Sequence, residues 1–218
     1  MRRAAVAVGL VLWVALPVAA RAGTVVFASD FESGLPAEIA APGAAIEPVQ
    51  GYAGLAGAGG AFAGSFLRYA ATGVFDTTLT LTGLPAHDVV SIGFLLAVID
   101  SWDGTELLQV WVDGVPVFSH GFQLATGDSS SYVPPAGGLL SSGSNLGFNS
   151  GGYHSRDRAY DLFVEPAFRD IPHTASTLTV TWRLSATVGG AAENWQGGLD
   201  ESWAIDALRV EVGPAASV

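Results

Sequence analysis

The sequence contains no cysteine and no lysine. Without cysteine the chain can form no disulfide, no thiol nucleophile and no cysteine-ligated zinc site, so its fold must depend on its core, its hydrogen bonds or a bound ion. Its nine basic residues are all arginines, against twenty acidic residues, and the formal net charge is −11. A nucleic-acid partner is not expected, because neutralising phosphates requires clustered basic residues. The acidic balance is instead compatible with cations, above all divalent ones.

Common catalytic motifs are also missing. The chain has no Gly-x-Ser-x-Gly elbow, no His-Glu-x-x-His pair and no phosphate-binding loop, and its four histidines are scattered singly. Two carboxylates could hydrolyse a glycoside, but the alternating Glu-x-Asp-x-x-Glu pattern of sandwich glycosidases is absent. We therefore expect a protein without catalytic activity, and rank a glycoside hydrolase third among its functions.

Residues 1–22 have the pattern of a secretory signal. Two arginines precede an uncharged apolar run from Ala4 to Ala20, and the small-x-small sequence Ala20-Arg21-Ala22 follows, which predicts cleavage after Ala22. A transmembrane anchor is the alternative, but no later run is long enough to span a bilayer. The expected location is extracellular or periplasmic, with no transmembrane segment after signal removal. Losing three arginines with the signal would lower the formal charge to about −14.

Alternating apolar and polar residues dominate the rest of the chain. Residues 75–84 and 176–186 place leucine, valine and tryptophan on one face and threonines on the other, as half-buried strands do. Residues 89–100 are continuously apolar, as in a central strand covered on both sides. Asp113-Gly114 between apolar arms predicts a hairpin, and Pro116 predicts that its second arm is an edge strand. Further strands are expected at 24–28, 61–70, 161–168 and 203–212.

These strands predict an all-β fold. We find no helix, and 28 glycines supply tight turns. The pattern favours a sandwich of two antiparallel sheets with jelly-roll connections, of the lectin-like or galactose-binding-like kind, in which the first and last strands are neighbours. One domain is expected over 23–213, followed by a short tail at 214–218. The Gly- and Ser-rich stretch 123–160 breaks the rhythm and predicts a long loop, either functional or disordered, with room for a short hairpin within it.

Acidic residues gather around tryptophans in the stretches 97–115 and 197–212. Asp100 directly follows an apolar run, so its carboxylate should be shielded and should need a cation or several donors. Asp103-Gly104 is equally typical of an ordinary turn. In a straight strand Asp100, Asp103 and Glu106 would not share a face, because side chains alternate, so this segment must bend. Calcium accepts carboxylates from such irregular segments.

Short motifs carry two family resemblances. "VVFASDFESG" (25–34) and "ESWAIDALRVEV" (201–212) resemble the two ends of jelly-roll domains in bacterial carbohydrate-binding modules and the animal MAM domain. That resemblance implies a structural calcium ion held by Glu32 and Asp206. "IDSWDG" (99–104) and "DESWAID" (200–206) look like motifs of a group of secreted bacterial and protist β-sandwich proteins. This second resemblance implies four further ligands: Asp100, Asp103, Asp200 and Glu201.

A glycan-binding face would need exposed aromatic rings beside polar side chains. The candidates are Tyr132, Tyr153, Arg156, Asn194 and Trp195. Together these patterns predict a secreted, non-catalytic, calcium-stabilised sandwich that binds an extracellular glycan or protein. The alternative from another class is a structural component of an extracellular matrix or envelope.

Overall fold

The computed structural model describes residues 23–73, 75–124, 130–148, 156–186 and 195–214, so the expected signal peptide and residues 215–218 lie outside the described part. The described residues form an all-β structure, as predicted. Their helical elements are three 3₁₀ turns: η1 (Gln50–Tyr52), η2 (Leu162–Val164) and η3 (Pro166–Phe168). No helix among the described residues has the length and apolar character needed to cross a membrane.

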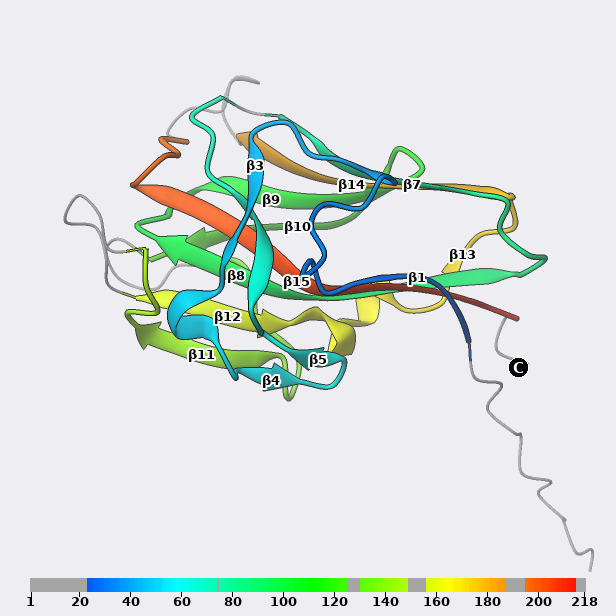
Figure 1. Cartoon of the computed structure of the whole chain (residues 1–218), viewed down its shortest axis with the longest axis horizontal. Coiled ribbons are helices and arrows are strands. Elements are labelled where there is room, and N and C mark those ends of the chain that lie inside the picture. The colour runs from blue at the N-terminus through cyan, green and yellow to red at the C-terminus, as the bar shows by residue number, and fades with distance from the viewer. Residues whose placement is uncertain (1–22, 74, 125–129, 149–155, 187–194, 215–218) are drawn as a thin grey trace, which may run out of the picture.

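Two antiparallel sheets face each other as the layers of a sandwich (Figure 1). The larger, eight-stranded sheet follows the order β11-β12-β8-β15-β6-β3, with β1 on β15 and β13 on β8. Its strands are β1 (Thr24–Ser29), β3 (Ala44–Pro48), β6 (Ser65–Tyr69), β8 (Val89–Asp100), β11 (Leu139–Ser144), β12 (Asp157–Asp161), β13 (Ile171–Pro172) and β15 (Glu201–Gly213). The sandwich prediction is therefore confirmed, while jelly-roll connectivity stays a prediction.

The smaller, five-stranded sheet follows the order β10-β9-β14-β7-β2. Its strands are β2 (Ile39–Ala40), β7 (Thr77–Thr82), β9 (Asp103–Val112), β10 (Val115–Gln123) and β14 (Thr177–Ala186). A separate ribbon pairs β4 (Ala56–Gly57) with β5 (Gly60–Ala61). The hairpin turn between β9 and β10 has positive φ at both Asp113 (47°) and Gly114 (79°), as a two-residue turn requires, and β10 is the edge strand that Pro116 predicts.

Strand β8 lies at the centre of the large sheet and is covered on both faces. Its residues Phe94, Leu96 and Val98 belong to the core between the sheets. The alternate residues Leu95, Ala97 and Ile99 belong to a second core on the outer face of the large sheet, formed with aromatic side chains such as Tyr52 and Phe66. We call the first the inner core and the second the outer core. The continuous apolar run of 89–100 is explained because both faces of the strand are buried.

The ends of the domain lie side by side. Strand β1 pairs antiparallel with the last half of β15, from Thr24 opposite Val212 to Ser29 opposite Leu208, and the two run together in Figure 1. The predicted adjacency of the first and last strands is confirmed. Because of this pairing, acids that are nearly 180 residues apart in the sequence can share one neighbourhood.

Two sequence-based expectations need correction. The strand expected at 161–168 is instead the end of β12 followed by η2 and η3. The reason is local, because the Asp161 and Glu165 carboxylates accept hydrogen bonds from the backbone of Phe163 and Ala167 and so cap these turns. The long loop expected at 123–160 is shorter than predicted, because the stretch contains β11 and most of β12, which pair antiparallel with each other where the sequence left room for a hairpin. Its residues 125–129 and 149–155 lie outside the described part.

Candidate metal centre

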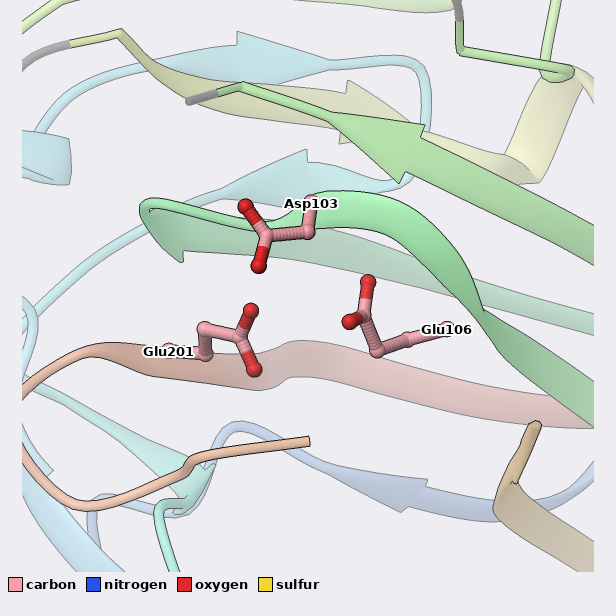
Figure 2. A group of neighbouring side chains, drawn as sticks. All are labelled: Asp103, Glu106 and Glu201. Atoms are coloured by element: carbon pink, nitrogen blue, oxygen red, sulfur yellow. The ribbon is translucent and has the colours of Figure 1, made fainter. Parts of the chain in front are cut away.

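A bulge at the start of β9 brings two acids to one face of the strand. In the β9–β10 pairing Leu107 lies opposite Gly121 and Asp103 lies opposite Gln123. The three residues 104–106 of β9 therefore lie opposite a single residue of β10, Phe122. Gly104 has φ 86°, a conformation that costs glycine little and other residues more. The extra residues break the normal alternation of side chains. Asp103 and Glu106, three residues apart, consequently point the same way (Figure 2).

The third acid comes from the other sheet. Glu201 is the first residue of β15, and side chains at alternate positions after it, Trp203 and Ile205, belong to the inner core. The same alternation directs Glu201 into the space between the sheets, toward β9. Figure 2 shows its carboxylate facing those of Asp103 and Glu106.

The two tryptophan-containing stretches meet directly at this end of the sandwich. The Trp102 indole N–H donates to the Ser202 carbonyl at 2.9 Å, and the Ser101 N–H donates to the Asp200 carbonyl at 3.0 Å. The Ser101 hydroxyl also donates to the Asp200 carboxylate. Both rings, Trp102 and Trp203, are buried in the inner core. These bonds hold the beginning of β9 against the beginning of β15 and so fix the relative position of the three acids.

Oxygen atoms of Asp103, Glu106 and Glu201 all lie within 4.8 Å of one another. Glu201 is fully buried and Glu106 is 2% exposed, whereas Asp103 is the most accessible of the three. Burial, opposed by the Gln196 N–H and reinforced by the charges of Glu106, Asp103 and Asp200, raises the pKa of Glu201 to about 8. Three carboxylates this close repel one another when ionised, so the group requires protons or a cation.

Hydrogen bonds satisfy only part of this group. The Gly104 N–H donates to Glu106 Oε2 at 3.1 Å, and the Gln196 N–H donates to Glu201 Oε2 at 3.0 Å. The other Glu201 oxygen, Oε1, is buried and has no hydrogen-bond partner within the described part of the chain. Native proteins rarely leave a buried polar atom unpaired, and the cost is about 1–3 kcal/mol. An oxygen-only set of carboxylates suits a hard cation such as Ca²⁺ or Mg²⁺.

The structure divides the six predicted metal ligands among three places. Asp103 and Glu201 belong to the cluster, and Asp200 is adjacent to it, bonded to Ser101. Asp100 is buried, but the charges that act on it come from Asp157, Arg68 and Asp200, not from the cluster. Glu106 is not among the predicted ligands, because these follow from the family resemblances, although the three-residue spacing from Asp100 to Glu106 already predicts a bend in this segment.

Glu32 and Asp206, the pair implied by the family resemblance, lie near each other at one short segment. The Ser65 N–H donates to Glu32 Oε1 at 2.9 Å, and the Ala63 N–H donates to Asp206 Oδ2 at 3.2 Å. Burial, with a contribution from the charge of Glu32, raises the pKa of Asp206 to about 7, against the backbone hydrogen bonds that lower it. Backbone N–H groups thus already occupy oxygens of both carboxylates.

The predicted glycan-binding residues do not form an exposed platform in the described part of the chain. Tyr132 is 5% exposed, and its hydroxyl donates to Glu165 at 2.8 Å. Trp195 is 7% exposed, and its indole N–H donates to the Ala71 carbonyl at 2.8 Å. Arg156 is exposed. Tyr153 and Asn194 lie outside the described residues. The Tyr132 and Trp195 rings therefore pack in the core, where a sugar could not stack on them.

Comparison with known proteins yields matches among solved structures alone. No known protein family matches the sequence, and no curated protein matches it. The catalytic domain of Agl-KA is similar over 83% of this chain and 27% of its own length, at 13% identity and a TM-score of 0.35. The catalytic domain of GH87 α-1,3-glucanase in complex with nigerose is similar over 84% of this chain and 27% of its own, at 17% identity and a TM-score of 0.34. The chain thus spans about a quarter of the length of these structures.

The prediction of a non-catalytic module that binds glycan or protein, with no enzymatic activity, is not kept, because the similar structures are catalytic domains. At TM-scores of 0.34 and 0.35 and identities below 25%, these structures assign no activity to this chain. The sequence-based argument relied on the absence of known acid motifs. That absence is weak evidence, because a bulge can bring acids together outside any regular spacing, as β9 does here.

Proposed function

We propose that this chain is a calcium-binding domain whose ion is held by Asp103, Glu106 and Glu201. The observation that carries the proposal is the Glu201 carboxylate, which is fully buried and faces two other acids, and whose Oε1 has no partner among the described residues. A divalent cation would pair that oxygen and offset the repulsion among the three charges.

The ion would connect the two layers of the sandwich. Asp103 and Glu106 belong to β9 of the smaller sheet, and Glu201 belongs to β15 of the larger one. A cation shared between them links strands that have no backbone hydrogen bonds to each other. In a chain without cysteine, such a link takes the place that a disulfide between the sheets has in other exported domains.

An extracellular setting supports calcium over other hard cations. The leader-like residues 1–22 predict export, and extracellular modules typically bind calcium with dissociation constants of about 10⁻⁴–10⁻³ M. Two buried acids and one accessible acid, all in one small space, are a suitable donor set for that range. The family-implied pair Glu32 and Asp206 is the less favoured location, because Glu32 is exposed and, among the described residues, neither carboxylate has a buried oxygen that lacks a hydrogen-bond partner.

Hydrolysis of a glycosidic bond by the same acids is the second candidate. One observation favours it: with a pKa of about 8, Glu201 holds a proton at neutral pH, as a general acid must, and other carboxylates lie within 4.8 Å. The burial of Glu106 and Glu201 argues against it, because a sugar ring must reach both catalytic carboxyls. Cation binding is therefore the better supported function.

Calorimetric titration of EDTA-treated protein with CaCl₂ tests the proposal. The wild type should bind calcium and Glu201→Gln should not. Glu38→Gln, which makes the same change at an exposed acid, should bind as the wild type does. In parallel, release of reducing sugar from α-1,3-glucan is measured for the same proteins. If Glu201→Gln still binds calcium but loses a wild-type hydrolytic activity, the second candidate is correct and the first is wrong.

A further inference from the structure

Asp100 is a buried carboxylate that the cluster of Asp103, Glu106 and Glu201 does not use. It is 1% exposed, and neither of its carboxylate oxygens has a hydrogen-bond partner among the residues that the structure describes. Leaving an ionised carboxylate buried without any donor is far more costly than leaving one neutral atom unpaired. A group in this condition requires a cation or a proton.

The backbone turns Asp100 to the opposite face of the sheet from Glu201. The two residues are partners in the β8–β15 pairing, and in a regular ladder their side chains would lie on the same face. Asp100, however, has φ 65°, unlike the extended residues before it. The groups whose charges act on Asp100 are led by Asp157 and Arg68, and Asp100 in turn acts on Tyr52 of the outer core.

Among the charged groups near Asp100, Asp157 has the largest effect on the pKa of its carboxylate. Hydrogen bonds hold Asp157 in place. It is fully buried at the start of β12, and its two carboxylate oxygens accept hydrogen bonds from the backbone N–H groups of Asp100 (2.8 Å) and Leu146 (2.6 Å). The first of these bonds holds the Asp157 carboxylate next to the backbone of Asp100. The charge of the Asp157 carboxylate therefore acts on a second buried carboxylate, that of Asp100.

The nearby arginine is committed elsewhere. Arg68 donates to the Ser202 hydroxyl through Nε at 2.9 Å, to the Glu47 carboxylate through Nη1 at 3.1 Å, and to the Gly198 carbonyl through Nη2 at 3.3 Å. Its guanidinium also lies over the Phe148 ring. Arg68 thus moderates the negative charge near Asp100 without bonding to its oxygens.

We propose that Asp100 and Asp157 form a second divalent-cation site, on the opposite face of the β8–β15 ladder from Asp103, Glu106 and Glu201. Its donors are oxygens, so the ion is a hard cation of the calcium class. Two acids near an arginine attract a cation less strongly than three acids without one. The second site is therefore the weaker, and the two sites fill in order.

Titration with Tb³⁺ and native mass spectrometry with Ca²⁺ test the proposal on the purified protein. The wild type should bind two equivalents, with the second phase several-fold weaker than the first. Asp100→Asn should lose the weak phase and keep the tight one, and Glu201→Gln should lose the tight phase and keep the weak one. Terbium emission excited through Tyr52, the neighbouring phenol, should report the weak phase in Glu201→Gln, and Tyr52→Phe in that background should reduce the emission without changing the number of equivalents.

Other outcomes separate the two proposals. A wild type that binds one equivalent, lost in Glu201→Gln and kept in Asp100→Asn, overturns the second site and shows that Asp100 holds only a proton. One equivalent lost in Asp100→Asn and kept in Glu201→Gln supports the second site and overturns the proposed function. If Asp100→Asn does not fold, Asp157→Asn is measured instead, with the same expected loss of the weak phase.

Discussion

Glu106 of β9 and Glu201 of β15 belong to different sheets, yet their carboxylates meet at one end of the sandwich. Each is almost completely buried. Two like charges in such a place oppose the approach of the sheets unless protons or a cation neutralise them. The stability of the whole domain should therefore depend on what occupies the space between them.

Removal of calcium should lower the melting temperature by several degrees. An ion that binds only the folded state stabilises it by about 2.7 kcal/mol at a hundredfold excess over its dissociation constant. In a domain of this size each kcal/mol shifts the melting temperature by roughly 2–4 °C. Thermal melts followed by circular dichroism in EDTA and in 10-fold increasing steps of CaCl₂ measure the shift. A melting temperature that is the same in EDTA and at every calcium concentration would contradict the proposed calcium site.

Glu201→Gln should abolish this calcium-dependent gain, while Asp206→Asn should retain it. The glutamine removes a ligand but also removes a buried acid, so in EDTA the variant should melt at or above the wild-type temperature. Asp206 is a matched control, because it is also buried on β15 and also has a raised pKa. The reverse result, with the gain lost in Asp206→Asn alone, would place the calcium at the pair formed by Glu32 and Asp206.

The ion-free protein should lose stability as the pH rises from about 4 to 8. The folded-state pKa is raised to about 8 for Asp100 and Glu201 and to about 7 for Asp206, well above the values near 4 expected in the unfolded chain. The folded state thus binds more protons than the unfolded state in this window. Its extra stability is complete below pH 4 and is lost as the pH passes through the folded-state pKa values.

Melts in EDTA between pH 4.5 and 8.5 measure this dependence, and saturating calcium should flatten it because the ion replaces the protons. Glu201→Gln should show a shallower decline than the wild type in EDTA. A melting temperature that climbs steadily from pH 4.5 to 8.5 without calcium is the result that would refute the raised pKa values.

The fold could be predicted from the sequence wherever alternation governs burial. Leu79 and Leu81 are buried between outward threonines, and Asp113-Gly114 forms the hairpin turn. The prediction of a strand at 161–168 is wrong, because a pattern of apolar and polar residues does not show that the Asp161 side chain caps a turn. Hydrophobic pattern thus predicts strands well, but local side-chain hydrogen bonds decide where they end.

The site was only partly predictable, for the same reason. Asp103 and Glu201 could be named because each belongs to a short motif that contains a tryptophan. Glu106 could not, because its inclusion depends on a bulge, and Gly104 in the sequence "WDG" is equally typical of a simple turn. Nor could Asp100 be separated from the cluster, since a positive φ at a residue other than glycine is set by its surroundings.

Gly104→Ala should weaken calcium binding more than it weakens the fold. The alanine must adopt φ 86°, and its Cβ would lie 2.9 Å from the Gln123 Cβ, so the bulge that brings Asp103 and Glu106 to one face must shift. Gly114→Ala is the control: it imposes a similar strain at φ 79°, but its Cβ meets nothing within 4 Å and it lies in the β9–β10 turn, at the far end of β9 from the acids. Each substitution should cost about 1 kcal/mol or more of unfolding free energy.

Titration calorimetry separates the two effects. Gly104→Ala should raise the calcium dissociation constant at least tenfold, which corresponds to about 1.4 kcal/mol of binding free energy. Gly114→Ala should leave that constant within about twofold of the wild type, a difference of about 0.4 kcal/mol. Equal calcium affinities in the two variants would mean that the β9 bulge does not position the ligands, and the cluster would then owe its geometry to the bonds between the Trp102 and Ser202 segments alone.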